Sequence, residues 1–236
     1  MNEKPTIKDV VKAYNLLVKN IEEEANTDTS LRAYGGMVRA GKGALVESIT
    51  KTLVQIAWDN LTGKPERLSF DKQPIKVPIK EGYIEKLDNE EIRDYINKNI
   101  EKYFYRFRTD VHTYIDGKLV MGIECKAYTE NAMLKRIMVD FTFLKEAYPD
   151  TKAVLLQLES QLGGDYSEIF KEITFGSYST HTIMSYFDVD LLILTLLEGE
   201  RKVDKPIHQS EHFKELDEKS VINALKIFEE ILQPYL

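Results

Sequence analysis

The sequence predicts an α/β fold in which helices flank both faces of a central mixed β-sheet. One observation is the order of the segments: helix, hairpin, helix, strand, helix, strand, helix. A second is the character of two strand-like runs, 153–158 and 189–197, which are mostly apolar. Such runs are typical of strands that are buried on both faces of a sheet.

Length and composition bound the class of protein. The chain has 236 residues, 43% of them hydrophobic and 30% charged. We therefore expect one domain over 1–236 with its core at about 44–158; one domain with a small lobe is the alternative. No apolar run approaches the roughly 20 residues of a membrane span. The N-terminus lacks the apolar run of a signal peptide, and the single cysteine fits a reducing compartment. We therefore expect a cytoplasmic protein without membrane contact.

The N-terminal sixty residues suggest two amphipathic helices, at 7–24 and at about 44–60, because apolar residues recur on one helical face. Between them, 31–46 holds four glycines and no acidic residue, and we expect a flexible segment. Its three basic residues are Arg32, Arg39 and Lys42. Such a segment can approach a phosphate backbone closely and bind it through charged groups. The alternative is an ordinary loop at a dimer contact.

The middle of the chain predicts a hairpin. Residues 61–82 resemble a loop with a short edge strand near 75–79, and a helix capped at Asp88 or Asn89 follows to about 102. Alternating residues then predict strands at 103–115 and 118–127. Asp116-Gly117 between these strands is a strong signal for a two-residue hairpin turn.

The remaining elements alternate between helix and strand. We expect them at 129–148 (helix), 153–158 (strand), after Asp165 with Glu168 as a capping box (short helix), 189–197 (strand) and 219–232 (helix). This order places helices on both faces of the sheet.

The hairpin carries the residues with the most informative chemistry. Glu124 and Lys126 are two apart on a strand, so they share one face, while Cys125 points to the other together with Leu119, Met121 and Ile123. Strict pairing from the two-residue turn would leave Asp110 opposite Ile123, on the wrong face. We therefore expect a bulge, a bend or a three-residue loop that turns Asp110 toward Glu124.

Two carboxylates and a lysine in one place can support phosphodiester hydrolysis. Hard oxygen ligands suit Mg²⁺, which lowers the pKa of a bound water, and an ammonium can stabilise charge on the phosphate. The plainer interpretation is that Asp110 faces solvent while Glu124 and Lys126 form a surface ion pair.

This layout resembles the PD-(D/E)XK nuclease superfamily, especially the type II restriction endonucleases. The resemblance is carried by Thr109-Asp110, with threonine where the family often has proline, by Glu124-Cys125-Lys126, and by the elements over about 44–158. It implies that Asp110, Glu124 and the Cys125 carbonyl bind Mg²⁺ and that Lys126 is catalytic. Many members add a glutamate from the preceding helix, and Glu47 matches that position. The alternative for Glu47 is a solvent-facing helical residue.

We expect the substrate to be double-stranded DNA. Lys135 and Arg136, after the triplet, could meet phosphate or form a solvated helical face. Residues 174–186 carry no formal charge and could contact base edges through hydroxyl and imidazole groups. The candidates there are Ser177, Ser179, Thr180 and His181. The alternative for this segment is a pair of strands or a loop under the sheet.

The function expected from the resemblance is a Mg²⁺-dependent, sequence-specific endonuclease from a prokaryote. Cutting both strands of a duplex favours a homodimer with two sites. Two alternatives stay open: a structure-selective repair or recombination nuclease of the same fold, and a non-catalytic interaction domain. The chain has no P-loop or dinucleotide fingerprint, so we expect no nucleotide cofactor.

Overall fold

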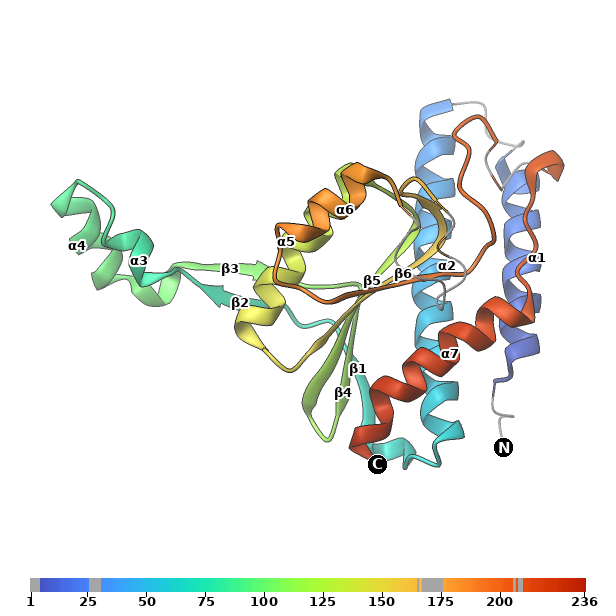
Figure 1. Cartoon of the computed structure of the whole chain (residues 1–236), viewed down its shortest axis with the longest axis horizontal. Helices are drawn as coiled ribbons and strands as arrows, with labels where there is room; N and C mark the ends of the chain where they lie inside the picture. The colour runs from blue at the N-terminus through green and yellow to red at the C-terminus, as the bar shows by residue number, and fades with distance from the viewer. Residues whose placement is uncertain (1–4, 26–30, 165, 167–175, 206, 208–209) are drawn as a thin grey trace.

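The computed structural model describes residues 5–25, 31–164, 166, 176–205, 207 and 210–236 (Figure 1). The side chains of 31–40 and 42 lie outside this description. The described helices of eight or more residues are α1 (Ile7–Ala25), α2 (Leu31–Asn60), α4 (Glu90–Lys98), α5 (Asn131–Ala147), α6 (Tyr178–Ser185) and α7 (Glu218–Leu232). Among the described residues, no helix has both the length and the apolar character needed to cross a bilayer.

The central sheet is mixed, as predicted. Its five strands lie in the order β1-β4-β5-β6-β7. Their bounds are β1 (Leu68–Asp71), β4 (Val111–Ile115), β5 (Lys118–Glu130), β6 (Lys152–Gln161) and β7 (Leu191–Thr195). The β1–β4 and β4–β5 pairs are antiparallel, whereas β5–β6 and β6–β7 are parallel.

Helices cover both faces of this sheet (Figure 1). On one face, α1, α2 and α7 bury the largest apolar cluster against β5 and β6, and Trp58 and Phe228 lie fully buried in it. On the other face, α5 packs through Ile137, Phe141 and Leu144. Helix α6 then packs against α5. Residues 119–125 of the central strand β5 are therefore buried without interruption, and this burial explains the apolar run there.

An arm formed by residues 72–109 joins β1 to β4 and extends away from the body (Figure 1). Its base is a two-stranded antiparallel ribbon of β2 (Ile75–Pro78) and β3 (Phe104–Phe107). Its tip holds the single turn α3 (Glu81–Ile84) and α4. Asn89 caps α4 as predicted, its side chain accepting from the Ile92 N–H. Ile75, Val77 and Phe107 attach the ribbon to the α5 side of the core.

The structure corrects several expected elements. Residues 31–46 are not a flexible segment, because α2 runs through them without a break. A Cβ added at Gly41 or Gly43 would meet nothing within 4 Å, so neither glycine serves a close contact. Each glycine costs a helix about 1 kcal/mol. The same helix continues directly into a buried apolar face, which begins at Leu45 and Val46 and includes Leu53 and Val54.

The C-terminal half also differs from expectation in detail. Residues 178–185 form α6 rather than strands or a loop, and residues 174–175 lie outside the described part of the chain. The expected capping box at Asp165 and Glu168 lies outside it as well. Strand β5 continues to Glu130, so the following helix begins two residues later than predicted.

Candidate active site

A β-bulge places Asp110 opposite Glu124. The hairpin turn has two residues as predicted, and Asp116 and Gly117 have φ angles of 50° and 77°. The shift lies within the strands, where Tyr114 pairs with Leu119 but Thr113 pairs with Met121. The extra residue is Val120. Val111 consequently pairs with Ile123, and the register moves by one from the strict pairing.

The same bulge corrects the expected face of Leu119. Leu119 packs on the α5 side of the sheet, whereas Val120, Met121 and Ile123 pack on the α2 side. Two consecutive residues on one side are the consequence of an inserted residue in an antiparallel pair. The bulge that was expected on chemical grounds is therefore confirmed. It reverses the faces of the β5 residues that precede Val120 relative to the strict alternation.

A turn between β3 and β4 brings Asp110 to the site. The strand expected at 103–115 is two strands in different sheets, because β3 ends at Phe107 and β4 begins at Val111. Thr109 anchors the turn: its hydroxyl donates to the Val111 carbonyl at 3.1 Å and its N–H donates to His112 Nε2 at 3.1 Å. Burial lowers the pKa of His112, which favours the neutral ring that this acceptor role requires. His112 is thus a structural residue behind Asp110.

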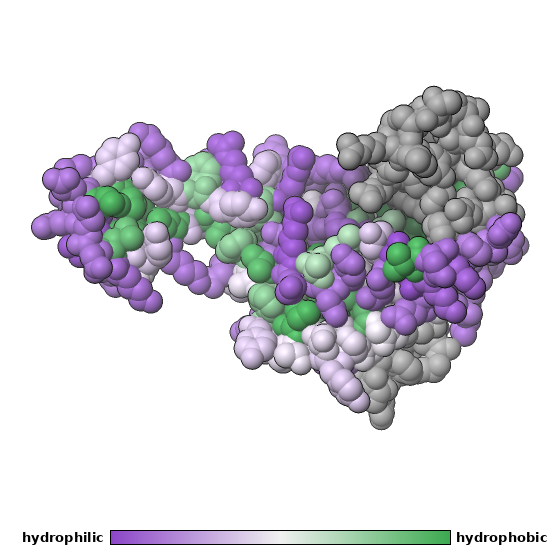
Figure 2. All heavy atoms as spheres, turned by 90° about the horizontal axis from the view of Figure 1, so that it is seen from above, coloured by the Kyte–Doolittle hydropathy of each residue, from purple (hydrophilic) through white to green (hydrophobic). Residues whose placement is uncertain are grey.

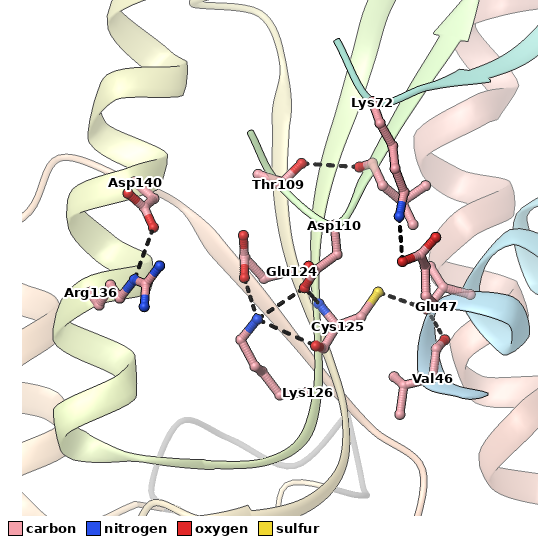
Figure 3. A network of polar contacts seen from close by, with 12 residues as sticks. Val46, Glu47, Lys72, Thr109, Asp110, Glu124, Cys125, Lys126, Arg136 and Asp140 are labelled. Atoms are coloured by element: carbon pink, nitrogen blue, oxygen red, sulfur yellow. Dashed lines mark hydrogen bonds and ion pairs between the residues drawn. The ribbon is translucent and has the colours of Figure 1, made fainter. Parts of the chain in front are cut away.

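Three oxygen atoms converge on the Lys126 ammonium (Figure 3). Lys126 Nζ lies 2.9 Å from Asp110 Oδ2 and 2.5 Å from Glu124 Oε2, and it donates to the Cys125 carbonyl at 3.3 Å. Asp110 Oδ2 also accepts from the Cys125 N–H at 2.8 Å. The structure therefore brings together the four residues at the centre of the predicted site.

Burial controls the electrostatics of this cluster. It raises the pKa of Glu124 to about 7, against the lowering effect of Lys126, and the nearby Asp110 raises it further. Burial also lowers the pKa of Lys126, but the two carboxylates outweigh it and the net direction is upward. The site thus holds a lysine that stays charged and a carboxylate that is neutral in part near pH 7 unless a cation stabilises it.

Cys125 contributes only its backbone to this face. Its side chain points to α2, where Sγ lies 3.3 Å from the Thr50 hydroxyl (Figure 3). Burial raises the pKa of the thiol to about 12, so the thiol is neutral and unreactive at physiological pH. Only the Cys125 carbonyl and N–H are available to the carboxylate site.

The carboxylates line a cleft of about 490 Å³ between the base of the arm, β5 and α5. Its lining includes Arg106 and Arg108 from the arm and Arg136 and Asp140 from α5. Arg136 Nε lies 3.8 Å from Asp140, and the Arg136 side chain is 87% exposed. Burial raises the pKa of Asp140. When it is ionised, the negative charge of Asp140 makes a smaller contribution to the raised pKa of Glu124. Sequence reasoning missed Arg106, Arg108 and Asp140; the helical spacing of Asp140 four residues after Arg136 was the available signal for it.

Glu47 forms its hydrogen bonds with two lysines outside this cluster. Its carboxylate accepts from Lys72 at 2.6 Å (Figure 3) and from Lys51 at 2.8 Å. Burial raises its pKa, but these two hydrogen bonds outweigh that effect and the net direction is downward. The structure therefore places Glu47 in an ion-pair network between α2 and the base of the arm, without a hydrogen bond to Asp110 or Glu124 in this conformation.

The predicted DNA-contacting residues fall into three groups. Lys135 and Arg136 are exposed on α5. Arg32, Arg39 and Lys42 belong to α2, and their side chains lie outside the description. In the third group, Ser177 caps α6, and the hydroxyl of fully buried Thr180 lies 2.7 Å from both the Leu162 carbonyl and the Asn131 side chain. These two hydroxyls are therefore occupied within the fold. The other two members of that group are exposed Ser179 and half-buried His181.

The three oxygen atoms around Lys126 are suitable ligands for a hard divalent cation. Carboxylate and carbonyl oxygens are what Mg²⁺ prefers, and an ammonium already lies where three of them converge. Within the described residues, no group of three or more His, Cys, Asp or Glu side chains is arranged to hold a metal. The residues that could bind a metal are therefore Asp110 and Glu124 through their side chains and Cys125 through its carbonyl. The cleft leaves room for water and a phosphate oxygen.

Comparison with known proteins identifies the family. The chain is 50% identical over 230 residues to the type II restriction enzyme DdeI of Desulfomicrobium norvegicum, covering 96% of this chain and 95% of that protein. No protein-family model matches the chain. The solved structure of the native BbvCI A2B2 tetramer aligns over 98% of this chain and 89% of that one, with a TM-score of 0.36 and 9% identity, which is too weak a likeness to add to the assignment. On the strength of the close relative, the chain belongs to the type II restriction enzymes, the family of site-specific deoxyribonucleases that its hairpin motif predicted.

Proposed function

We propose that this chain hydrolyses phosphodiester bonds of double-stranded DNA at a specific sequence, using Mg²⁺ held by Asp110, Glu124 and the Cys125 carbonyl. The observation that supports this most directly is the convergence of those three oxygens on Lys126 Nζ. Burial raises the pKa of Glu124, and the neighbouring Lys126 ammonium offsets that rise only in part. A divalent ion supplies the missing positive charge.

Each residue then has a defined task. Bound Mg²⁺ would neutralise charge on the phosphate and lower the pKa of a water molecule. Asp110 and Glu124 supply the anionic ligands, and the Cys125 N–H holds Asp110 in place through its 2.8 Å hydrogen bond. Lys126 keeps its proton, because both carboxylates raise its pKa, and so stabilises negative charge on the attacking and phosphate oxygens. Glu47 would support the site indirectly, because its ion pairs with Lys51 and Lys72 link α2 to the base of the arm.

The cleft selects the substrate by charge. Arg136 projects from α5 into solvent at its edge, where a guanidinium can bind a phosphate next to the scissile one. Lys135, Ser179 and His181 are exposed or half-buried on α5 and α6, and we propose that they contact DNA. Arg32, Arg39 and Lys42 belong to α2 and are proposed as DNA contacts from the sequence alone. A duplex has two scissile strands, so we propose a homodimer with one such cleft per strand.

Cleavage of plasmid and phage DNA tests the proposal. With Mg²⁺, the wild-type chain should yield discrete linear fragments, and EDTA should abolish them. Asp110→Asn and Glu124→Gln should lose cleavage, whereas Asp116→Asn should keep it. Asp116 is a suitable control because it lies on the same hairpin and is bonded to Arg67, outside the cleft. A smear of random products, or cutting that survives both site variants, would contradict the assignment.

A further inference from the structure

The arm separates its charges along its length. Its base, formed by 72–80 and 103–109, carries five lysines and arginines and no acidic residue. Its tip, formed by 81–102, carries seven acidic residues and four basic ones. Figure 2 shows hydrophilic side chains along most of the arm, with apolar ones at the tip and again toward the body. Segregation of this kind on a chain of net charge −7 points to two surfaces with different tasks.

Two of the basic residues at the base oppose each other directly. In the ribbon, Lys76 of β2 is paired with Arg106 of β3. Like charges placed opposite on an antiparallel pair repel and destabilise it. Both cations lie over the ring of Phe104, at 4.6 Å for Lys76 Nζ and 5.0 Å for Arg106 Cζ. The ring holds them side by side but leaves their charge uncompensated.

The five basic residues of the base differ in whether they form ion pairs. Lys72 and Lys80 are bonded to Glu47 and Glu146. For Lys76, Arg106 and Arg108, by contrast, no acidic partner lies within ion-pair distance among the residues that the structure describes. An anionic ligand would relieve the repulsion that the ribbon itself leaves in place.

The position of the ribbon identifies that ligand. Arg106 and Arg108 line the same cleft as Asp110, Glu124 and Lys126. Only Thr109 separates Arg108 from Asp110 in the chain. A nucleic-acid strand whose phosphate reaches the carboxylates therefore continues onto the exposed face of the ribbon.

We propose that the exposed face of the β2–β3 ribbon is a phosphate-binding site for the duplex, with Lys76 and Arg106 holding the backbone beside the scissile phosphate and Arg108 linking the two sites. The inference rests on the proposed function and extends it to a surface outside the hydrolytic cluster. The ribbon makes no base contact in this role, so it contributes affinity and register rather than sequence choice. The acidic tip would repel phosphate and lies beyond the bound strand.

The salt dependence of DNA binding tests the proposal. Each phosphate contact contributes about 0.9 to the slope of log Kd against log salt. The double variant Lys76→Ala/Arg106→Ala should therefore lose about 1.8 from the slope, so that the rise in Kd between about 50 and 200 mM NaCl is about 12-fold smaller than in the wild type. The probe is a short mixed-sequence duplex in EDTA, which prevents cleavage.

A matched variant on the same arm provides the control. Arg93→Ala/Lys98→Ala removes two positive charges from α4 at the tip and should leave the slope unchanged. Lys76→Arg/Arg106→Lys should restore the wild-type slope, and thermal unfolding of all three variants reports whether each folds.

Two results would overturn the proposal. One is an equal slope in the ribbon and tip variants. The other is loss of self-association in the ribbon variant with an unchanged slope, which would assign the ribbon to the acidic tip of a second copy of this chain. The proposed function fails separately, through absence of Mg²⁺-dependent cleavage by the wild type, whatever the salt dependence.

Discussion

Glu124→Gln should stabilise the metal-free protein at high pH. Glu124 is buried beside Asp110, and burial raises its pKa from an ordinary 4.5 to about 7. Because the folded-state pKa lies above the unfolded value, the native chain binds this proton more tightly than the unfolded chain does. The stability contributed by the protonated form is present in full below pH 4.5 and is lost as the pH rises through about 7. A glutamine has no proton to lose.

The difference between 4.5 and about 7 sets the magnitude. At about 1.4 kcal/mol per pKa unit, it corresponds to about 3 kcal/mol of unfolding free energy, already net of the attraction to Lys126. We therefore expect the variant and the wild type to be matched near pH 4.5, and the variant to be about 3 kcal/mol more stable at pH 8. Mg²⁺ at about 100 times its Kd should raise the unfolding free energy of the wild type by about 2.7 kcal/mol. It should not raise that of the variant, which lacks the Glu124 carboxylate.

Urea unfolding in EDTA at the two pH values measures the effect. Asp116→Asn is the matched control, since that carboxylate is exposed and its hydrogen bond with Arg67 lowers its pKa rather than raising it. The control should show no gain at high pH. A stability difference between Glu124→Gln and wild type that is the same at both pH values would refute the reasoning, because Glu124 would then titrate as an ordinary carboxylate.

Three further variants probe the same hairpin. Lys126→Met should lower the cleavage rate at saturating DNA about 10²- to 10³-fold while leaving Mg²⁺ binding intact, as followed by single-turnover kinetics and by calorimetry. Cys125→Ala should keep the rate within about twofold and lower the unfolding free energy by about 1 kcal/mol, since only the Cys125 backbone faces the site and Sγ packs against Thr50. Gly122→Ala should destabilise the fold by about 1–3 kcal/mol in urea titrations, because its Cβ would lie 2.6 Å from Cδ2 of buried Leu144. A loss of cleavage in Cys125→Ala, or a stable Gly122→Ala, would contradict the orientation of β5.

Local chemistry explains which elements the sequence could predict. Asp116-Gly117 specified the turn because both residues must adopt positive φ, and the apolar run of β6 specified burial on both faces. Period-two alternation placed Glu124 and Lys126 on one face without any structure. The motif thus led to the restriction-enzyme family, which the 50% identical relative confirms.

The continuous helix α2 is an element that the sequence did not predict. Four glycines between 31 and 46 favoured a flexible segment, yet the backbone is helical from Leu31 onward. Glycine lowers helix propensity only by about 1 kcal/mol per residue, a cost that tertiary packing of the same helix outweighs. The expectation weighed local propensity alone, without the buried face of the same helix that begins at Leu45 directly after the last glycine.

The amino-acid sequence alone determined that two carboxylates and a lysine flank a hairpin, because residue type and spacing are local properties. Only the tertiary structure decided that they meet. The Val120 bulge, the turn between β3 and β4 and the burial of Glu124 each depend on how segments pair and pack: β4 against β5, the arm against the α5 side of the core, and α5 over the sheet. Register, sheet membership and desolvation are relations between segments, and no single segment encodes them.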